Sequence, residues 1–307
     1  LAWGICVVAL WALLFGFRKT RQWRQPVSFD PARRRLLRTS GAMLVAAPVA
    51  FTGYGIAVER NRFRLTEVDV PLAGLPADLN GLRIVQLSDI HLGPFLERKE
   101  LRRVVEMANE TRAHLAVVTG DLITLRDDFL ADCLEELSRL RAEAPILGCL
   151  GNHEEVARCQ QRAKSEGARA GIDFLRGERR RLRFGSAALN VAGVDYQQKR
   201  RQYLTAAGEM VRPGEVNVLL SHNPDVFPVA AKQGYDLTLA GHTHGGQVTV
   251  EILHQYLNVA RFFTPYVYGL YRQVRSAIFV TRGIGTVAVP ARIGAPPEIA
   301  LIRLCAI

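Results

Sequence analysis

The sequence predicts an α/β domain that contains a sheet with parallel strands, and three observations support this fold class. Short apolar segments of strand length alternate with segments that have the apolar spacing of helices. Between residues 82 and 154 the order is strand, helix, strand, helix, strand, which is typical of a sheet with helices on its faces. The 307 residues are 49% apolar and 22% charged, a globular composition with an apolar excess.

The apolar excess lies at the start of the chain. Residues 1–17 are uncharged and contain Trp3 and Trp11, which favours a transmembrane helix, its start missing, over a buried core helix. Residues 41–58 form a second, less hydrophobic uncharged segment. No convincing small-residue cleavage site is found, so we expect this segment to stay in the membrane as a second anchor. The sequence therefore predicts N-terminal membrane segments before the α/β domain.

A basic linker, residues 18–40, separates the two segments and carries eight Arg or Lys residues against one acid. Arg33 and Arg34, before an apolar segment, resemble a twin-arginine export signal, and a positive-inside loop between two membrane helices is the alternative. Both interpretations place the linker in the cytoplasm and residues 60–307 outside, at the cell membrane. Three arginines within residues 60–64 weaken this asymmetry.

The formal net charge of +11 is divided between these parts. Residues 1–59 carry +6 and the remainder carries +5, so the high isoelectric point reflects membrane topology rather than binding to nucleic acid. An arginine-rich stretch, residues 176–183, fits a solvated surface hairpin better than a nucleic-acid patch. The five cysteines have neither metal-site nor disulfide spacing, and small buried core residues are the simplest interpretation.

The expected elements of the domain follow the apolar pattern from residue 60 onward. Strand segments are expected within residues 65–70, 82–93, 115–123, 145–154, 189–195, 216–220, 237–240, 277–281 and 298–304. Helical spacing is found in residues 97–112, 127–141 and 225–233. Residues 155–186 are polar and rich in Arg, and we expect a surface helix and a hairpin there.

Polar side chains follow five of these strands, at the point where each strand ends. They are Asp89 and His91, Asp121, Asn152 and His153, His222, and His242 and His244. Strand-end loops on one edge of an open α/β sheet are where ligands bind. Such a cluster of carboxylates and buried polar groups would be costly unless divalent cations bind to it. Carboxylate, amide and imidazole without Cys suit Mn²⁺, Fe or Zn²⁺, and the number of groups suits two metals.

The motifs DIHLG, GDLI, GNHE, SHNPD and GHTHGG resemble the five blocks of the calcineurin-like metallophosphoesterase superfamily, in the expected order within residues 82–304. The twin Arg before the domain and the closing GIGT and PPEI are similar to the YkuE/YaeI-type bacterial phosphodiesterase branch. The resemblance implies a four-layer α/β/β/α sandwich. It also implies a first metal on Asp89, His91 and His244, a bridging Asp121, and a second metal on Asn152, His222 and His242.

The resemblance further implies hydrolysis of a phosphoric ester by metal-activated hydroxide, without a covalent enzyme intermediate. His153 would contact no metal and would instead face the substrate phosphate, where it can also protonate the leaving oxygen. Family members often carry an acid after the bridging Asp to orient this His, and this chain has Thr124 there. The candidates to replace that acid are Asp127, Asp128 and Glu154.

Several functions are compatible with the motifs. The leading hypothesis is a membrane-anchored phosphodiesterase or pyrophosphatase that acts on a cell-envelope or lipid-linked phosphate. The aromatic residues within 262–271 suggest an amphiphilic substrate, although packing alone also explains them. The alternatives are a UDP-2,3-diacylglucosamine-type pyrophosphatase at the cytoplasmic face, a non-catalytic metal-binding scaffold, and a nuclease that binds DNA through residues 176–183. No Tyr adjoins Asp121, which argues against a purple acid phosphatase. We expect a phosphoester substrate and a membrane, and no specific nucleic acid, as partners.

Overall fold

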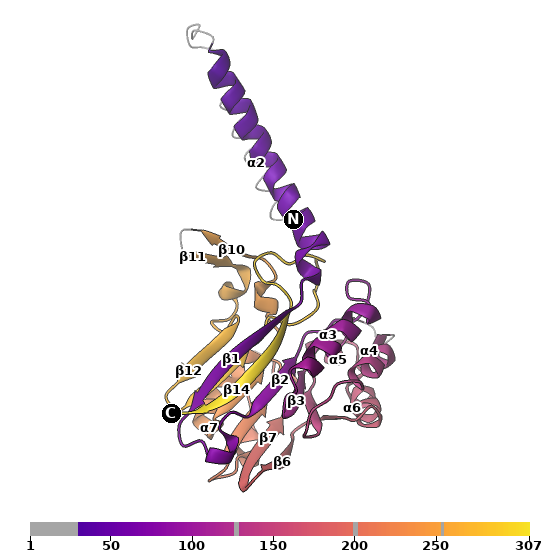
Figure 1. Cartoon of the computed structure of the whole chain (residues 1–307), viewed down its shortest axis with the longest axis vertical. Helices are drawn as coiled ribbons and strands as arrows, with labels where there is room; N and C mark the ends of the chain where they lie inside the picture. The colour runs from indigo at the N-terminus through magenta and orange to yellow at the C-terminus, as the bar shows by residue number, and fades with distance from the viewer. Residues whose placement is uncertain (1–29, 126–128, 199–201, 253–254) are drawn as a thin grey trace. The chain divides into compact units, whose positions relative to one another are not determined.

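The computed structural model describes residues 30–125, 129–198, 202–252 and 255–307 (Figure 1). The chain divides into two units, residues 1–49 and 50–307. The transmembrane helix predicted for residues 1–17 and the first part of the expected basic linker lie outside the described residues.

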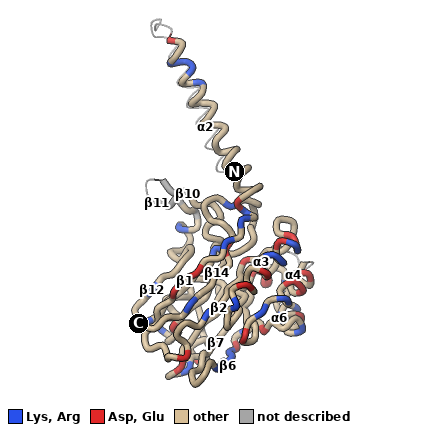
Figure 2. The backbone as a smooth tube through the Cα atoms, in the orientation of Figure 1, with Lys and Arg blue, Asp and Glu red and all other residues tan. Residues whose placement is uncertain are grey.

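One long helix, α2 (Pro31–Ala57), begins within the expected basic linker and continues through the second apolar segment. The side chain of Asp30 caps its start by accepting the backbone N–H groups of Ala32 and Arg33, at 2.9 and 3.2 Å. The arginines lie in the first turns and the rest of the helix is uncharged (Figure 2). Together with the turn that follows, residues 31–61 are long and apolar enough to cross a membrane.

The first sheet has six strands, and the last strand of the chain is inserted between the first two. Its order is β1 (Arg64–Leu72), β14 (Glu298–Ala306), β2 (Arg83–Leu87), β3 (Leu115–Thr119), β4 (Ile146–Cys149) and β5 (Ile172–Phe174). β14 is antiparallel to β2, and every other neighbouring pair is parallel. The crossover helices α3 (Arg98–Glu110), α4 (Leu130–Leu137) and α6 (Gln160–Arg169) lie on one face of this sheet (Figure 1).

The second sheet also has six strands. Its order is β12 (Gly269–Gln273), β13 (Ser276–Val280), β9 (Leu237–Ala240), β8 (Val216–Leu220), β7 (Ala187–Gly193) and β6 (Glu178–Phe184). The four central strands are parallel, and the edge strands β12 and β6 are antiparallel to their neighbours. The helix α7 (Phe227–Gln233) connects β8 to β9, and a separate hairpin, β10 (Thr249–Ile252) and β11 (Gln255–Asn258), follows β9.

The alternation of side chains along the strands builds three apolar layers. In β2, Val85 and Leu87 pack with α3 and α4, whereas Ile84 packs against the second sheet. Val218 of β8 lies in the same inner layer as Ile84, and the next residue, Leu219, packs on the outer side with α7. The expected four-layer α/β/β/α sandwich is therefore confirmed. Cys133, Cys149 and Cys159 are buried within its layers, as expected.

The arginine-rich stretch forms the edge strand β6, paired with β7 in the expected surface hairpin. Its guanidinium groups lie close to carboxylates, at 2.6–2.8 Å, in the pairs Arg176–Asp195, Arg180–Asp173 and Arg181–Glu215. Three of the five arginines in this stretch are thus balanced by protein carboxylates, which reduces the positive charge that DNA binding would use. Figure 2 shows basic and acidic residues interspersed in this part of the molecule.

Candidate metal centre

The eight residues predicted for the site lie on loops at one edge of both sheets, where strands end. β2, β3 and β4 of the first sheet precede Asp89 and His91, Asp121, and Asn152 and His153, while β8 and β9 of the second sheet precede His222, His242 and His244. The structure gathers seven of these side chains into overlapping groups with the spacing of metal ligands. The eighth, Asn152, is the neighbour of His153 at the start of α5 (Asn152–Val156).

The backbone of this site is strained. Left-handed conformations, with φ between 49° and 75°, occur at Asp89, His91, Asp121, His242 and His244. Each costs a residue other than Gly about 1 kcal/mol or more, and such strain clusters at functional sites. Glycines allow the loops to approach, because a Cβ atom on Gly241 would clash with the Asp89 carboxylate and one on Gly151 would clash with Asp121.

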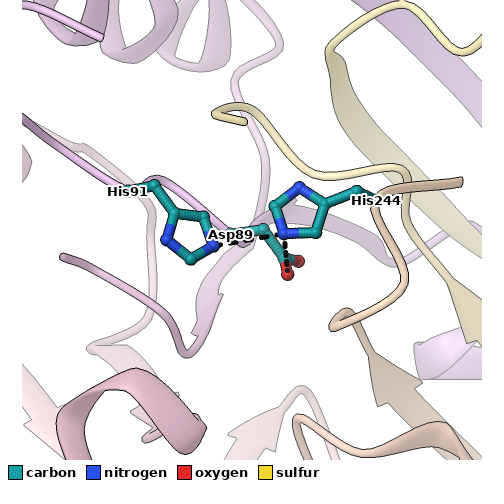
Figure 3. A group of neighbouring side chains, drawn as sticks. All are labelled: Asp89, His91 and His244. Atoms are coloured by element: carbon teal, nitrogen blue, oxygen red, sulfur yellow. Dashed lines mark hydrogen bonds and ion pairs between the residues drawn. The ribbon is translucent and has the colours of Figure 1, made fainter. Parts of the chain in front are cut away.

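The first group consists of Asp89, His91 and His244 (Figure 3). The Nε2 atoms of His91 and His244 lie 3.1 Å apart, and Nε2 of His244 lies 3.4 Å from Oδ1 of Asp89. All three side chains are buried. Two imidazole nitrogens and a carboxylate oxygen thus converge on one point, as the ligands of a metal ion do.

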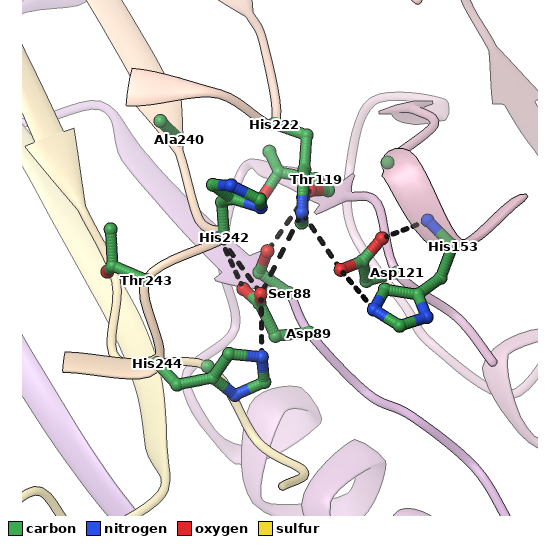
Figure 4. Close-up of polar contacts among 12 residues, drawn as sticks. Ser88, Asp89, Thr119, Asp121, His153, His222, Ala240, His242, Thr243 and His244 are labelled. Atoms are coloured by element: carbon green, nitrogen blue, oxygen red, sulfur yellow. Dashed lines mark hydrogen bonds and ion pairs between the residues drawn. The ribbon is translucent and has the colours of Figure 1, made fainter. Parts of the chain in front are cut away.

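The second group consists of Asp121, His222 and His242. Oδ2 of Asp121 lies 3.0 Å from Nε2 of His222 and 3.5 Å from Nε2 of His91. Asp121 therefore contacts a histidine of each group. On its remaining side is Nε2 of His153, at 4.0 Å (Figure 4). His91, Asp121 and His153 form a third group with the spacing of metal ligands.

The electrostatics of the cluster favour a bound cation. Burial and, to a smaller extent, the nearby Asp121 carboxylate raise the pKa of Asp89 to about 6, against the lowering effect of His222. Burial lowers the pKa of His91 to about 3 and that of His242 to about 4. Burial also disfavours protonation of His222, but the Asp121 carboxylate outweighs it and raises the pKa to about 10. A divalent cation among these groups would offset the buried negative charge and replace the proton on His222.

In four of the histidines, the ring nitrogen that we call outer lies next to an oxygen atom; it is Nδ1 in His222, His153 and His91, and Nε2 in His242. Nδ1 of His222 donates to the carbonyl of Thr119 at 2.7 Å, and Nδ1 of His153 donates to the carbonyl of Thr124. The remaining two contacts, both at 3.4 Å, join Nδ1 of His91 to Oγ1 of Thr124 and Nε2 of His242 to the hydroxyl of Tyr196. Such partners fix the orientation of each ring and leave its inner nitrogen for a ligand.

Unpaired buried atoms complete the donor set. Within the described part of the chain, Oδ1 of Asn152 is among the buried side-chain atoms without a hydrogen-bond partner, and Nε2 of His222 lies 3.0 Å from Oδ2 of Asp121 without the angles of a hydrogen bond. Buried polar atoms are ordinarily paired, and an unpaired one at a functional cluster suggests an ion or ligand. Carboxylate, amide oxygen and imidazole donors, with no thiolate, fit a divalent metal ion such as Mn²⁺, Fe²⁺ or Zn²⁺.

Comparisons with known proteins agree with this geometry. The calcineurin-like phosphoesterase family model matches residues 82–246, more than half of the chain. The chain belongs to this family. It is 29% identical over 339 residues to a transmembrane protein with metallophosphoesterase domain of Danio rerio, covering 98% of this chain and 71% of the relative. It is 28% identical over 279 residues to the metallophosphoesterase YkuE of Bacillus subtilis, covering 89% and 97%. A metallophosphoesterase of Aquifex aeolicus is 30% identical over 243 residues, covering 73% and 85%.

In this phosphoesterase, a backbone carbonyl takes the place of the acid that was expected to orient His153. The carbonyl of Thr124 takes that place, while the hydroxyl of the same residue faces His91. Glu154 has another role: its buried carboxylate accepts the backbone N–H groups of Asp121 at 3.0 Å, Leu122 at 2.7 Å and Gly151 at 2.7 Å. It therefore joins the loops after β3 and β4. Residues 127 and 128 lie outside the described part of the chain.

Two further residues of the site are not predicted from the sequence. Tyr196 follows β7, which ends at the same edge as the other site strands, so the strand-end rule could have found it. Arg292 is fully buried and donates to the carbonyls of Arg282, Gly283, Gly285 and Ala295, at 2.5–3.1 Å. It holds the turn behind Asp89, since a Cβ on Gly283 would clash with that side chain. A single Arg in a loop belongs to no sequence pattern from which this structural role could be predicted.

Proposed function

We propose that this protein is a membrane-anchored phosphodiesterase or pyrophosphatase that uses two divalent metal ions. The observation that carries the proposal is the position of Asp121, whose Oδ2 atom lies between a histidine of each group, at 3.0 Å from His222 and 3.5 Å from His91. One carboxylate shared by two ligand groups is the arrangement of two-metal hydrolases. The identity of the metal, Mn²⁺, Fe or Zn²⁺, is left to elemental analysis because the donors suit all three.

The proposed ligands follow the first and second groups. Asp89, His91 and His244 would hold the first ion, Asp121 would bridge, and Asn152, His222 and His242 would hold the second. The ions would supply positive charge that lowers the pKa of water towards neutrality and offsets the charge of the phosphate. The protein holds the donors in place beforehand, through the strained loops and the outer hydrogen bonds of the imidazoles.

His153 is proposed to act on the substrate directly. Its Nδ1 atom donates to the carbonyl of Thr124, so Nε2 is directed towards Asp121, at 4.0 Å. Its side chain is 14% exposed, whereas that of Asp121 is 2% exposed, which places the ring at the open side of the cluster. With both nitrogens protonated, Nε2 can donate a hydrogen bond to a phosphate oxygen and transfer its proton to the leaving oxygen.

Two substitutions test this function in the full-length, detergent-solubilised protein. We expect the unsubstituted chain to bind about two divalent ions and to hydrolyse a model phosphodiester such as bis(4-nitrophenyl) phosphate. Asp121→Asn should lose bound metal and turnover together. His153→Ala should keep its metal but lose turnover by about 100-fold or more. Turnover unchanged in both variants, with folding confirmed by circular dichroism, would falsify the proposal.

The side of the membrane distinguishes the proposed envelope enzyme from a UDP-2,3-diacylglucosamine-type pyrophosphatase at the cytoplasmic face. The arginines in the first turns of α2 precede its apolar part, and cytoplasmic basic residues would place the catalytic domain outside. Alkaline phosphatase fused after residue 307 should then be active, and a cytoplasmic fluorescent reporter fused there should not. The opposite pair of results would favour the cytoplasmic enzyme.

A further inference from the structure

An exposed apolar surface lies in the loops next to the metal centre. We call it the apolar rim, and it consists of Val248, Phe262, Phe263 and Val289, with exposed fractions of 38, 88, 71 and 51%. The nearby Tyr266 is packed instead, because its ring makes edge contacts with Phe227 and Tyr271. The aromatic segment thus has a packed part and an exposed part. Adjacent exposed phenylalanines in a folded domain indicate a contact surface.

Hydrogen bonds connect the apolar rim to the metal centre. The carbonyl of Gly245, next to His244, accepts from Nδ2 of Asn258 at 2.7 Å. Oδ1 of the same Asn258 caps the turn η7 (Val259–Phe262) by accepting a backbone N–H at 2.8 Å. Phe262 therefore lies on a turn that shares one buried side chain with the loop of His244. A ligand or surface that contacts the apolar rim would therefore lie close to the metal centre.

The apolar rim is also connected to the end of the candidate membrane span. The backbone N–H of Arg292 donates to the carbonyl of Gly55 in the last turn of α2, at 3.3 Å. The next residue, Ile293, forms a bridge with Val248 and accepts from the N–H of Thr249 at 2.7 Å. Residues 50–307 form one unit, so these contacts lie within it. The last turn of the span and the rim therefore share one set of loops.

We propose that the apolar rim lies on the lipid bilayer that α2 enters and holds the metal centre at the level of the lipid headgroups. A chain that leaves the membrane at the end of α2 keeps the loops bonded to that end near the membrane surface. Tyr54, in the last turns, is 43% exposed, and tyrosines are enriched at membrane interfaces. Arg261, an exposed cation beside Phe262, suits anionic headgroups.

This placement also defines the class of substrate, a step that rests on the proposed function. A site held at headgroup level meets phosphate esters carried by lipids or other amphiphiles before it meets dissolved ones. The apolar rim would contact the acyl or glycerol part while the metal centre contacts the phosphate. A phosphate ester embedded in a bilayer is therefore the expected substrate class.

The position of the rim is measured without turnover. The full-length chain carrying Phe262→Cys is spin-labelled and placed in nanodiscs of phosphatidylethanolamine and phosphatidylglycerol. The control is Val274→Cys, 95% exposed in the β12–β13 turn, at the far end of the strands from the site. The unsubstituted chain corrects for native cysteines. We expect the label at 262 to be accessible to oxygen and protected from a water-soluble nickel reagent, about 5–10 Å into the interface, and the label at 274 to be exposed to water.

Two results would overturn the proposal. A label at 262 that is as exposed to water as the label at 274 shows that the rim does not touch the bilayer. A label at 262 that is inaccessible to both oxygen and the nickel reagent in nanodiscs shows a contact with protein, either a second copy or another part of the chain. Because the measurement needs no substrate, failure of the proposed hydrolysis would leave it unaffected.

Turnover of two substrates tests the consequence. The double variant Phe262→Ser, Phe263→Ser should hydrolyse a bilayer-embedded phosphodiester about tenfold more slowly than the unsubstituted chain, because partial burial of two rings is lost. Its turnover of bis(4-nitrophenyl) phosphate should not change, and Val274→Ser should match the unsubstituted chain on both. Equal losses on both substrates would show a structural role and overturn the proposed class. Absent turnover of either ester by the unsubstituted chain would count against the proposed function alone.

Discussion

Glu154 shows how one residue next to the ligands can control the site. Its buried carboxylate accepts hydrogen bonds from the backbone N–H groups of Asp121, Leu122 and Gly151. In Glu154→Gln, an NH2 group replaces one carboxylate oxygen. This NH2 group cannot accept a hydrogen bond, so at least one of the three backbone N–H groups loses its acceptor. We expect the free energy of unfolding to fall by about 2 kcal/mol and the affinity for metal to fall with it. Urea denaturation and metal titration measure the two effects.

The matched control for Glu154 is Glu143→Gln, which removes the same charge from an exposed side chain. It should change the free energy of unfolding by less than about 0.5 kcal/mol. Equal stability of both variants would show that the three backbone contacts at Glu154 contribute little.

The individual ligands could be predicted from the sequence because each motif is local. Asp89 and His91 are two residues apart, as are His242 and His244, and each pair follows a strand. Their partners could not be predicted in this way, because they come from distant parts of the chain. Thr119 faces His222 and Tyr196 faces His242 only after the loops of both sheets meet. The residue pattern of one segment does not predict contacts between loops of different sheets.

At the scale of elements, an ion-pair cluster around one buried carboxylate joins α3 to α4. The fully buried Glu136 accepts from Arg98 and Arg102, each at 2.8 Å, and lies 3.3 Å from Arg139. The hydrogen bond from Arg102 lowers the pKa of Glu136 to about 2, against burial, from its ordinary 4.5. Because the pKa is lower in the folded state, the contribution to stability is complete above pH 4.5 and is lost as the pH falls towards 2.

This sign gives a prediction for acid unfolding. Between about pH 6 and pH 3, the unsubstituted chain should lose on the order of 1 kcal/mol more free energy of unfolding than Glu136→Gln, which cannot titrate at this position, because solvent screens arginines that are 37–53% exposed. At about pH 6 the variant should be the less stable protein, because Arg102 loses the carboxylate that it contacts, whereas Arg98 keeps Asp132 and Glu135. Urea denaturation of both chains across this range measures the difference. Parallel pH profiles would contradict it.

The elements that could be predicted are those whose pattern reflects burial. β2, β3 and β8 are buried along almost their whole length, and their apolar runs are plain in the sequence. The edge strand β6 is half exposed and rich in Arg, so no apolar run marks it. The helix α2 unites the arginines of the expected linker with the following apolar segment. The change from charged to uncharged residues predicts a boundary between a linker and a membrane segment, but the helix continues across it.

At the scale of the whole molecule, the metal centre lies where the two sheets meet. β2, β3 and β4 lead to the donors on one side, and β8 and β9 lead to those on the other. The alternation of strands and helices predicts layers, but not that β14 enters the sheet between β1 and β2. That order depends on tertiary contacts between the two ends of the domain. Ions bound at this junction would link the sheets as well as act on a substrate.

Removal of metal should therefore lower the stability of the whole domain. Ions that bind only the folded chain stabilise it by about 4 kcal/mol when present at about 1,000 times their Kd, which corresponds to about 10 °C in Tm for a domain of this size. We expect chelation to lower Tm by about that amount and added metal to restore it. Asp121→Asn, which lacks the proposed bridging carboxylate, should show a much smaller response to both treatments. A Tm that is the same before and after complete chelation would show that the two sheets are held together without the ions.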